Sequence, residues 1–311
     1  MRKVYLNHDG GVDDLVALFL MLQMPEVELV GVGVIPGDCY LEPAVSASRK
    51  IIDRFGHGVK LAVAASNSRP QNPFPKEWRM HAFTVDALPL LNESGQVGTP
   101  QAVLPAHLHL VELLQKATEK IDLVFVGPLT DLARALAEDA SIQAKIGTLY
   151  WMGGTFLPEG NVQEPEHDGT AEWNAFWDPQ AVADVWASDL TIDLVALEST
   201  NKVPLRNETR AFWAQKRQAL GVDFLGQAYA IVPPLVHYAT NSTYYLWDVL
   251  TAASFGEPTL VTKKVVRSKV HADGLSQGQT YADPTGRPVN LVYDVKHDAF
   301  FDYITQLAEK A

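Results

Sequence analysis

Residues 4–14 change from a strand to a helix within one short stretch, and this constrains the fold more than any other part of the chain. Residues 4–6 are apolar, aromatic or β-branched, as expected for a central strand. Gly10 and Gly11 then allow a turn through backbone angles that a side chain would hinder. From Val12 onward the sequence is apolar almost all round, which predicts a buried helix.

The same alternation continues along the chain and predicts a mostly parallel sheet with flanking crossover helices. Further strands are expected at 27–35, 59–64, 121–126, 148–152 and 190–197. Helices are expected at about 43–54, 107–119 and 130–138, after Asp178-Pro179, and through most of 204–254 with an interruption near 239–243. Residues 260–270 and 288–295 are expected to form a small antiparallel extension, closed by a helix at about 298–310.

Two segments, 66–104 and 155–171, lack this periodicity. A long irregular segment inside a compact domain is usually functional or disordered. The first segment contains Phe74, Trp78 and Phe83, and this aromatic content predicts an ordered lid or rim. No repeat or linker interrupts the pattern, so residues 1–311 are predicted to form a single α/β domain.

Composition restricts the class of function. The net charge of −12 argues against nucleic acid as a partner, because phosphate binding needs a basic surface. Cys39 is the only cysteine, so no intrachain disulfide is expected. The chain begins with a strand pattern rather than an apolar signal region, and no run of about 18 apolar residues predicts a membrane span. We therefore expect a soluble, cytoplasmic protein that acts on a small molecule.

Three carboxylates, Asp9, Asp13 and Asp14, follow the first predicted strand, where open α/β sheets bind their ligands. Like charges at such close spacing repel one another unless a cation neutralises them. A set of oxygen ligands favours a hard cation such as Ca²⁺ or Mg²⁺. For Asp13 and Asp14 the alternative is a purely structural role at the helix N-terminus. Asp9, placed before a Gly-Gly turn, favours the metal site.

Other side chains that could carry chemistry are weaker signals when each is taken alone. Asp38 also follows a strand end, whereas Asp248 begins a short apolar helix where a structural role is the stronger reading. Glu172 and Asn174 flank an indole, so they could hold hydroxyls beside a stacking surface. His8 lies on the opposite strand face from Asp9 and is predicted to be a packed core histidine. His237 could approach the site, but no catalytic histidine pairing is evident.

Taken together, these segments resemble the nucleoside hydrolases, and most closely their inosine–adenosine–guanosine-preferring branch. The family opens with D-x-D-x-G-x-D-D, and residues 7–14 here read Asn-His-Asp-Gly-Gly-Val-Asp-Asp. Further matches follow in family order at 37–39, 72–79, 126–130, 152–154, 168–174, 199–201 and 244–252. The resemblance implies a Rossmann-like open sheet and a calcium-dependent enzyme that splits purine ribonucleosides into free base and ribose. It also implies a role in purine salvage and a homo-oligomer, either a dimer or a tetramer.

The resemblance also implies roles for individual residues. Calcium would be held by Asp9, Asp14, the backbone carbonyl of Val126, and Asp248, with Asp9 also the general base for the attacking water. The ribose hydroxyls would be held by Asp13, Asp38, Asn161, Glu172 and Asn174, and the base pocket would be lined by Trp78, Trp173 and Trp247. By the residues alone, Asn161 could equally be a turn residue and Trp78 could simply anchor its loop.

Two departures from the family pattern affect these expectations, and one position differs from the pyrimidine-accepting branch. Asn7 replaces the first Asp of the motif, and Gly11 stands where the purine branch commonly has Asn. Trp247 occupies the position of the histidine that serves the pyrimidine-accepting branch as leaving-group acid. Broader specificity that includes pyrimidines is the first alternative to the purine preference. A Mg²⁺-dependent phosphohydrolase, which would need a basic phosphate-binding motif, and a non-catalytic nucleoside-binding protein are the others.

Overall fold

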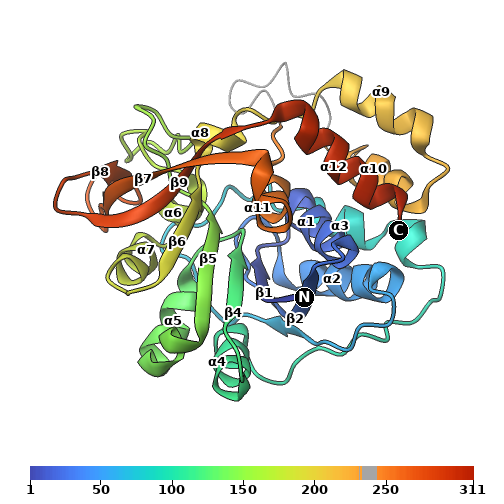
Figure 1. The fold of residues 1–311 in the computed structure, drawn as a ribbon, viewed down its shortest axis with the longest axis horizontal. Helices are drawn as coiled ribbons and strands as arrows, with labels where there is room; N and C mark the ends of the chain where they lie inside the picture. Colours follow the sequence, from blue (N-terminus) through green and yellow to red (C-terminus); the bar gives the residue numbers. More distant parts are fainter. Residues whose placement is uncertain (231, 233–243) are drawn as a thin grey trace.

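A computed structural model describes residues 1–230, 232 and 244–311 and contains one nine-stranded sheet (Figure 1). The strand order is β3-β2-β1-β4-β5-β6-β9-β7-β8. The strands are β1 Arg2–His8, β2 Val27–Val34, β3 Val63–Ala65, β4 Ile121–Phe125, β5 Ile146–Met152, β6 Thr191–Val195, β7 Val261–Val270, β8 Thr280–Ala282 and β9 Arg287–Val295.

Helices pack on both faces of this sheet. The α-helices in the described residues are α1 Val12–Gln23, α2 Leu41–Phe55, α3 His81–Asp86, α4 Ala106–Lys116, α5 Thr130–Glu138, α6 Trp173–Trp177, α7 Pro179–Trp186, α8 Leu197–Thr200, α9 Asn207–Lys216, α10 Leu220–Ala230, α11 Trp247–Gly256 and α12 His297–Glu309. The 3₁₀ helices are η1 Pro89–Leu91, η2 Ala140–Lys145 and η3 Pro258–Leu260. One apolar core joins the sheet to α1, α2, α10, α11 and α12, and a second joins it to α4, α5 and α7.

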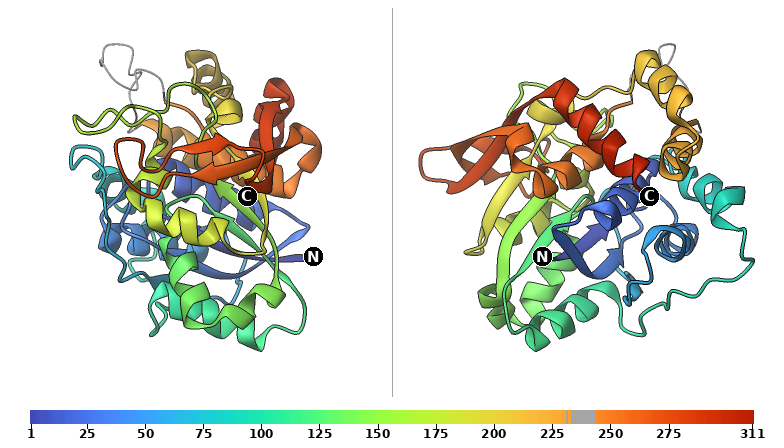
Figure 2. Two further views of the ribbon diagram at one scale, coloured as in Figure 1. Left: turned by 90° about the vertical axis from the view of Figure 1, so that its left-hand side faces the viewer. Right: turned by 45° about the vertical axis from the view of Figure 1, so that its right-hand side comes forward.

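The strand pairing confirms the predicted α/β class. Strands β1 to β6 pair in parallel, whereas β7 is antiparallel to both β8 and β9. The C-terminal strands are nevertheless part of the main sheet, because β9 pairs in parallel with β6. Figure 2 shows this hairpin region (orange to red) extending from the edge of the sheet.

Some elements differ from the sequence prediction. The strand expected at 59–64 is the shorter β3, placed by its pairing with Val32–Val34 of β2. The segment 66–104 is ordered, as predicted, but it contains α3 and η1, because Ala82 and Val85 bury themselves against the core. The strand β8 and the helix α8 were not expected. The predicted interruption near 239–243, and His237, lie outside the described residues.

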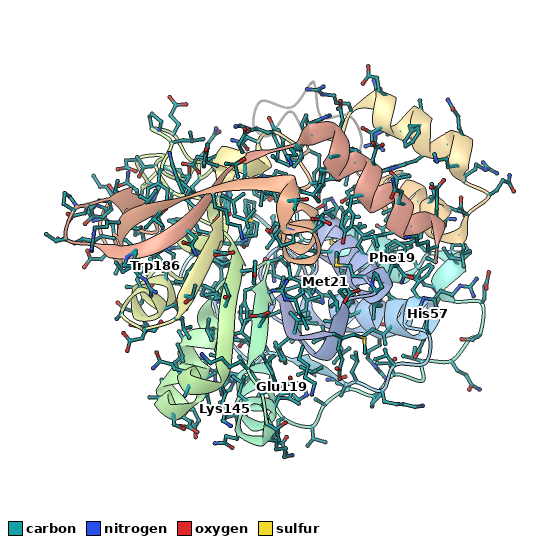
Figure 3. All side chains as sticks on the ribbon, viewed as in Figure 1. Phe19, Met21, His57, Glu119, Lys145 and Trp186 are labelled. Atoms are coloured by element: carbon teal, nitrogen blue, oxygen red, sulfur yellow. The ribbon has the colours of Figure 1, made fainter. Side chains whose placement is uncertain are left out.

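Helix α1 runs through the interior and carries Asp13 and Asp14 in its first turn. Every residue from Val12 to Met21 is buried, which confirms the predicted buried helix (Figure 3). The Phe19 ring lies 4.7 Å from that of Phe55 and 5.1 Å from that of Phe224, both in edge-on geometry. The apolar core therefore encloses α1 along most of its length.

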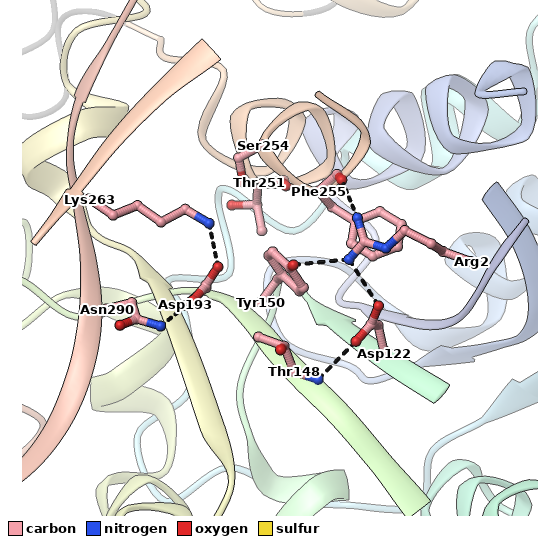
Figure 4. A network of polar contacts seen from close by, with 10 residues as sticks. All are labelled: Arg2, Asp122, Thr148, Tyr150, Asp193, Thr251, Ser254, Phe255, Lys263 and Asn290. Atoms are coloured by element: carbon pink, nitrogen blue, oxygen red, sulfur yellow. Dashed lines mark hydrogen bonds and ion pairs between the residues drawn. The ribbon is translucent and has the colours of Figure 1, made fainter. Parts of the chain in front are cut away.

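Polar contacts join several strands of the sheet to one another and to α11 (Figure 4). Arg2 of β1 donates to Asp122 of β4 at 2.9 Å and to the Phe255 carbonyl of α11 at 2.8 Å. Lys263 of β7 makes an ion pair with Asp193 of β6. Arg2 and Lys263 are thus each paired with a carboxylate.

We predict that Phe19→Ala lowers the free energy of unfolding by about 3–5 kcal/mol, because it removes a fully buried ring and leaves a cavity. Phe212→Ala is the matched control, since that ring is 37% exposed and should cost about 1 kcal/mol or less. Urea unfolding followed by circular dichroism measures both, and equal losses would contradict the role assigned to Phe19.

Candidate active site

Five carboxylates from four parts of the chain meet at the carboxyl ends of β1 and β2. Asp9 follows β1, while Asp13 and Asp14 lie in the first turn of α1. Asp38 lies between β2 and α2, and Asp248 lies in the first turn of α11. All but the partly buried Asp38 are buried. The fold thus brings Asp248 to the amino-terminal acids from the distant end of the chain.

The Gly-Gly turn permits this close approach. Gly10 has φ +87°, and a Cβ on it would lie 2.4 Å from the Ala44 Cβ atom. A Cβ on Gly11 would lie 2.5 Å from Asp38 Oδ2 and 2.8 Å from Asp14 Oδ2. A side chain at position 11 would therefore displace two of the carboxylates, which accounts physically for glycine at this departure from the purine-branch pattern.

Backbone donors orient the acids around Asp9. The Asp9 N–H donates to Asp14 Oδ1 at 2.9 Å, and the Asp38 N–H donates to Asp9 Oδ2 at 2.8 Å. A Cβ on Gly37 would lie 2.3 Å from Asp9 Oδ2, so the neighbouring backbone also encloses this carboxylate. Asp9 is consequently held in one orientation between the two strand ends.

Asp13 supports α11 rather than its own helix. Its Oδ2 atom accepts from the Asp248 N–H at 2.6 Å and from the Val249 N–H at 3.4 Å, and its Oδ1 atom accepts from the Tyr229 hydroxyl. The N-cap of α1 is Gly11, without a side-chain cap bond. Asp13 and Asp14 do lie in the first turn of α1, where the helix dipole favours negative charge, so the structural alternative for these two acids stays open. The ribose contact for Asp13 stays a prediction.

Burial and mutual repulsion dominate the electrostatics of this cluster. Burial raises the pKa of Asp9 well above its usual value, and the charges of Asp14 and Asp38 raise it further. Burial also raises the pKa of Asp14 and of Asp248, each helped by neighbouring carboxylates. Burial raises the pKa of Asp13 and of Asp38 to about 7. An added positive charge would relieve this repulsion.

The donor chemistry of the cluster fits a hard cation. Asp9, Asp14, Asp248 and the Val126 carbonyl provide oxygen ligands only, which suits Ca²⁺ or Mg²⁺. A Cβ on Gly11, Gly37 or Gly127 would come within 3 Å of one of the carboxylates, so these glycines let the backbone pack closely around the acids. Within residues 1–230, 232 and 244–311, no group of three or more His, Cys, Asp or Glu side chains is arranged so that it could hold a metal ion. The metal site stays a prediction.

A second polar group borders the cluster near α6. Glu172 accepts from the N–H groups of Gly154 and Asn174, both at 2.9 Å, and burial raises its pKa to about 7. Asn174 Nδ2 donates to the Val126 carbonyl at 3.2 Å. Asn161 Oδ1 accepts from the Trp173 N–H at 3.0 Å. Of the predicted sugar-binding groups, Asn174 therefore lies beside the predicted ligand Val126, and Glu172 is bonded to the Asn174 backbone.

The predicted base-binding tryptophans fall into two aromatic groups. The Trp78 and Trp173 rings lie 5.4 Å apart, and Phe74 stacks on Trp173 at 5.0 Å. Trp247 instead packs edge-on against Tyr244 at 4.8 Å, beside the main core. The first group forms an aromatic wall contributed by the segment 66–104 and α6.

Two supporting residues were not singled out from the sequence. Arg79 donates to the carbonyls of Pro36 and Cys39, at 3.3 and 3.4 Å. Burial raises the pKa of Asp38, and the positive charge of Arg79 offsets part of that rise. Tyr229 lies on α10 and reaches Asp13 across the core. Arg79 belongs to a segment that matches the family pattern, whereas Tyr229 lies in no such segment.

The prediction for His8 is confirmed. The residue is fully buried, and its Nε2 atom lies 3.0 Å from Ser48 Oγ. Burial lowers the pKa of His8 to about 3. It is a neutral core histidine that packs β1 against α2.

No helix of the described residues has both the length and the apolar character that crossing a membrane requires.

The family model described as inosine-uridine preferring nucleoside hydrolase matches residues 4–302. The crystal structure of an inosine-uridine preferring nucleoside hydrolase from Bacillus anthracis is 63% identical, with a TM-score of 0.95 over 100% of both chains. The probable uridine nucleosidase 2 of Oryza sativa subsp. japonica is 25% identical over 285 residues, which are 91% of this chain and 82% of the relative. The non-specific ribonucleoside hydrolase RihC of Escherichia coli K12 is 27% identical over 209 residues, 65% of this chain and 63% of the relative.

We predict that Tyr229→Phe lowers the free energy of unfolding by about 1.5–3 kcal/mol, because it removes a hydroxyl donor from the buried Asp13 carboxylate. Tyr281→Phe is the matched control, since that ring stacks on His271 in the hairpin region, and we expect a change of about 0.5 kcal/mol or less. Thermal or urea unfolding provides the comparison. Indistinguishable stabilities would show that the Tyr229 hydroxyl does not support the cluster.

Proposed function

The chain belongs to the nucleoside hydrolase family, and we propose that it hydrolyses the N-glycosidic bond of purine ribonucleosides to release the free base and ribose. Hydrolysis of ribonucleosides in general follows from membership of this family. The observation that carries the proposal is the meeting of Asp9, Asp14 and Asp248 at the carboxyl end of β1.

We propose Asp9, Asp14, the Val126 carbonyl and Asp248 as the groups that hold Ca²⁺. When bound, a divalent cation lowers the pKa of a water molecule and so makes it available as a nucleophile near neutral pH. The burial of these acids supports the proposal, because their mutual repulsion disfavours the charged forms until a cation offsets it.

In this proposal Asp9 is the general base that takes the proton of the attacking water. The Asp38 N–H and the packed glycine backbone hold the Asp9 carboxylate in place, so little reorganisation is needed during proton transfer. Cleavage of a ribosidic bond proceeds through an oxocarbenium-like state with positive charge on the sugar. The surrounding carboxylates stabilise that developing charge.

The polar groups around the acids are proposed to bind the ribose. These are Asp13, Asp38, Asn161, Glu172 and Asn174. Glu172 and Asn174 are buried, and Asn174 already contacts the Val126 carbonyl, so sugar binding and cation binding would share one wall. Displacement of one of these groups would therefore disturb both sugar binding and cation binding.

The purine preference is supported by the aromatic wall of Trp78 and Trp173, with Trp247 contributed by α11. The leaving base must gain a proton or carry charge, and position 247 is an indole rather than a histidine acid. Electron-rich indole faces attract positive charge, so stacking favours a base protonated at N7 by solvent. A two-ring base gains more from this stacking than a pyrimidine does.

Broader specificity that includes pyrimidines is the second candidate. It is favoured by the names of the relatives, which include an inosine-uridine preferring enzyme at 63% identity and a probable uridine nucleosidase at 25%. The family gives no support to a phosphohydrolase. A single domain over residues 1–311, the homo-oligomer, the cytoplasmic location and the role in purine salvage stay predictions.

Asp9→Ala is predicted to lower kcat by about 10²–10⁴-fold or more, because it removes the general base and one cation ligand. Release of ribose from inosine, measured with a reducing-sugar assay, checks this. Asp273→Ala is the control, since Asp273 is exposed and lies in the hairpin region. Normal inosine turnover by Asp9→Ala would refute the mechanism.

A nucleoside panel assayed with and without a calcium chelator is predicted to show two effects. Inosine, adenosine and guanosine should exceed uridine and cytidine by about tenfold or more in kcat/KM, which corresponds to about 1.4 kcal/mol. Chelation should abolish turnover, and added Ca²⁺ should restore it. Uridine turnover equal to that of inosine would favour the broader specificity, whereas full activity in the chelator would remove the cation from the proposal.

A further inference from the structure

Asn7 and Asp131 face each other in the interior, close to the candidate active site. Asn7 lies at the end of β1 and is 1% exposed, whereas Asp131 lies in the first turn of α5 and is fully buried. Asn7 Nδ2 donates to Asp131 Oδ2 at 3.2 Å. An amide and a carboxylate from distant parts of the chain thus form one buried pair.

The surroundings of Asp131 suit a carboxylate. Its Oδ1 atom accepts from Ser66 Oγ at 2.6 Å and from Ser68 Oγ at 2.8 Å. These two hydroxyls and the Asn7 amide provide three neutral donors, and the start of a helix also favours negative charge. Burial raises the pKa of Asp131 while the three donors lower it.

The position of Asn7 is coupled to two residues that the proposed function uses. The Asn7 carbonyl accepts from the Val126 N–H at 2.9 Å, and Asp9 follows two residues later on the same strand end. A Cβ on Gly33 would lie 2.6 Å from Asn7 Nδ2, so the amide is enclosed on the β2 side. A shift of Asn7 would therefore move both Asp9 and the Val126 carbonyl.

A second carboxylate at position 7 would face Asp131 at hydrogen-bond distance. Two buried like charges at this separation repel strongly, and the donor that Asp131 now receives would be lost. The pair should nevertheless tolerate an exchange of the two groups, because one amide and one carboxylate would still face each other. The serine hydroxyls could then donate to the amide oxygen instead.

We propose that Asn7 is a positioning residue whose amide–carboxylate pair with Asp131 holds the end of β1, and with it Asp9 and the Val126 carbonyl, in the catalytic arrangement. The roles of Asp9 and Val126 in this statement rest on the proposed function. The pair itself rests on the hydrogen bonds and the burial of the two side chains.

The test is a double-mutant cycle with Asn7→Asp, Asp131→Asn and the double variant. Asn7→Asp is expected to lower Tm by about 5 °C or more, because it places two carboxylates together in the interior. The double variant should regain at least half of that loss. Asn207→Asp and Asp273→Asn make the same chemical changes at exposed positions, and each should shift Tm by about 1 °C or less.

Kinetics then separate positioning from stability. At a temperature where every variant is folded, Asn7→Asp should lower kcat for inosine by about tenfold or more while KM changes by less than about threefold. It should also raise the Ca²⁺ concentration needed for half-maximal activity. The double variant should recover both quantities.

Losses that simply add in the double variant, or a Tm of Asn7→Asp equal to that of the parent protein, would overturn the proposal. If Asn7→Asp yields no folded protein, folding of the double variant supports the pair and its failure to fold refutes it. The melting data are independent of the substrate. If the parent protein does not hydrolyse nucleosides, the proposed function is refuted. The melting temperatures of the double-mutant cycle would still test the pairing of Asn7 with Asp131.

Discussion

Repulsion among buried carboxylates is the constraint on which the rest of this structure depends. Asp9, Asp14 and Asp248 lie within range of one another's charge, and burial raises the pKa of each well above its usual value. A fold does not bring such groups together for stability, because each separately prefers water. The proposed cation, or the positive charge that develops on the sugar during the proposed cleavage, would offset this repulsion.

Several structural features hold this unfavourable cluster in place. Helix α1 is buried along most of its length, so its first turn cannot move away from β1. Asp13 accepts hydrogen bonds from the start of α11 and thereby holds Asp248 against the other acids. At the amino-terminal end of β1, Arg2 joins this strand to β4 and α11. Apolar packing and paired charges elsewhere in the protein thus offset the repulsion among the buried carboxylates.

The end of β1 shows how the residue at position 7 depends on a side chain from a distant part of the chain. Asn7 departs from the family motif, and by itself the change looks like the loss of a charge. In the structure its amide faces Asp131, which already has two serine donors. The buried negative charge in this region is therefore on Asp131 of α5 rather than at position 7 of β1. This explains why an amide, which can donate to Asp131, suits position 7 beside the site.

The sequence by itself determined the α/β class, the buried α1 and the strand–turn–helix that carries Asp9, because these depend on local periodicity and on glycine at the turn. It also indicated Asp248 as a partner, but only through resemblance. The tertiary structure alone decided that Asp13 supports α11, that Tyr229 and Arg79 stabilise the site, and that β9 joins β6. These contacts join residues far apart in the chain, and no local pattern encodes which distant side chains will meet.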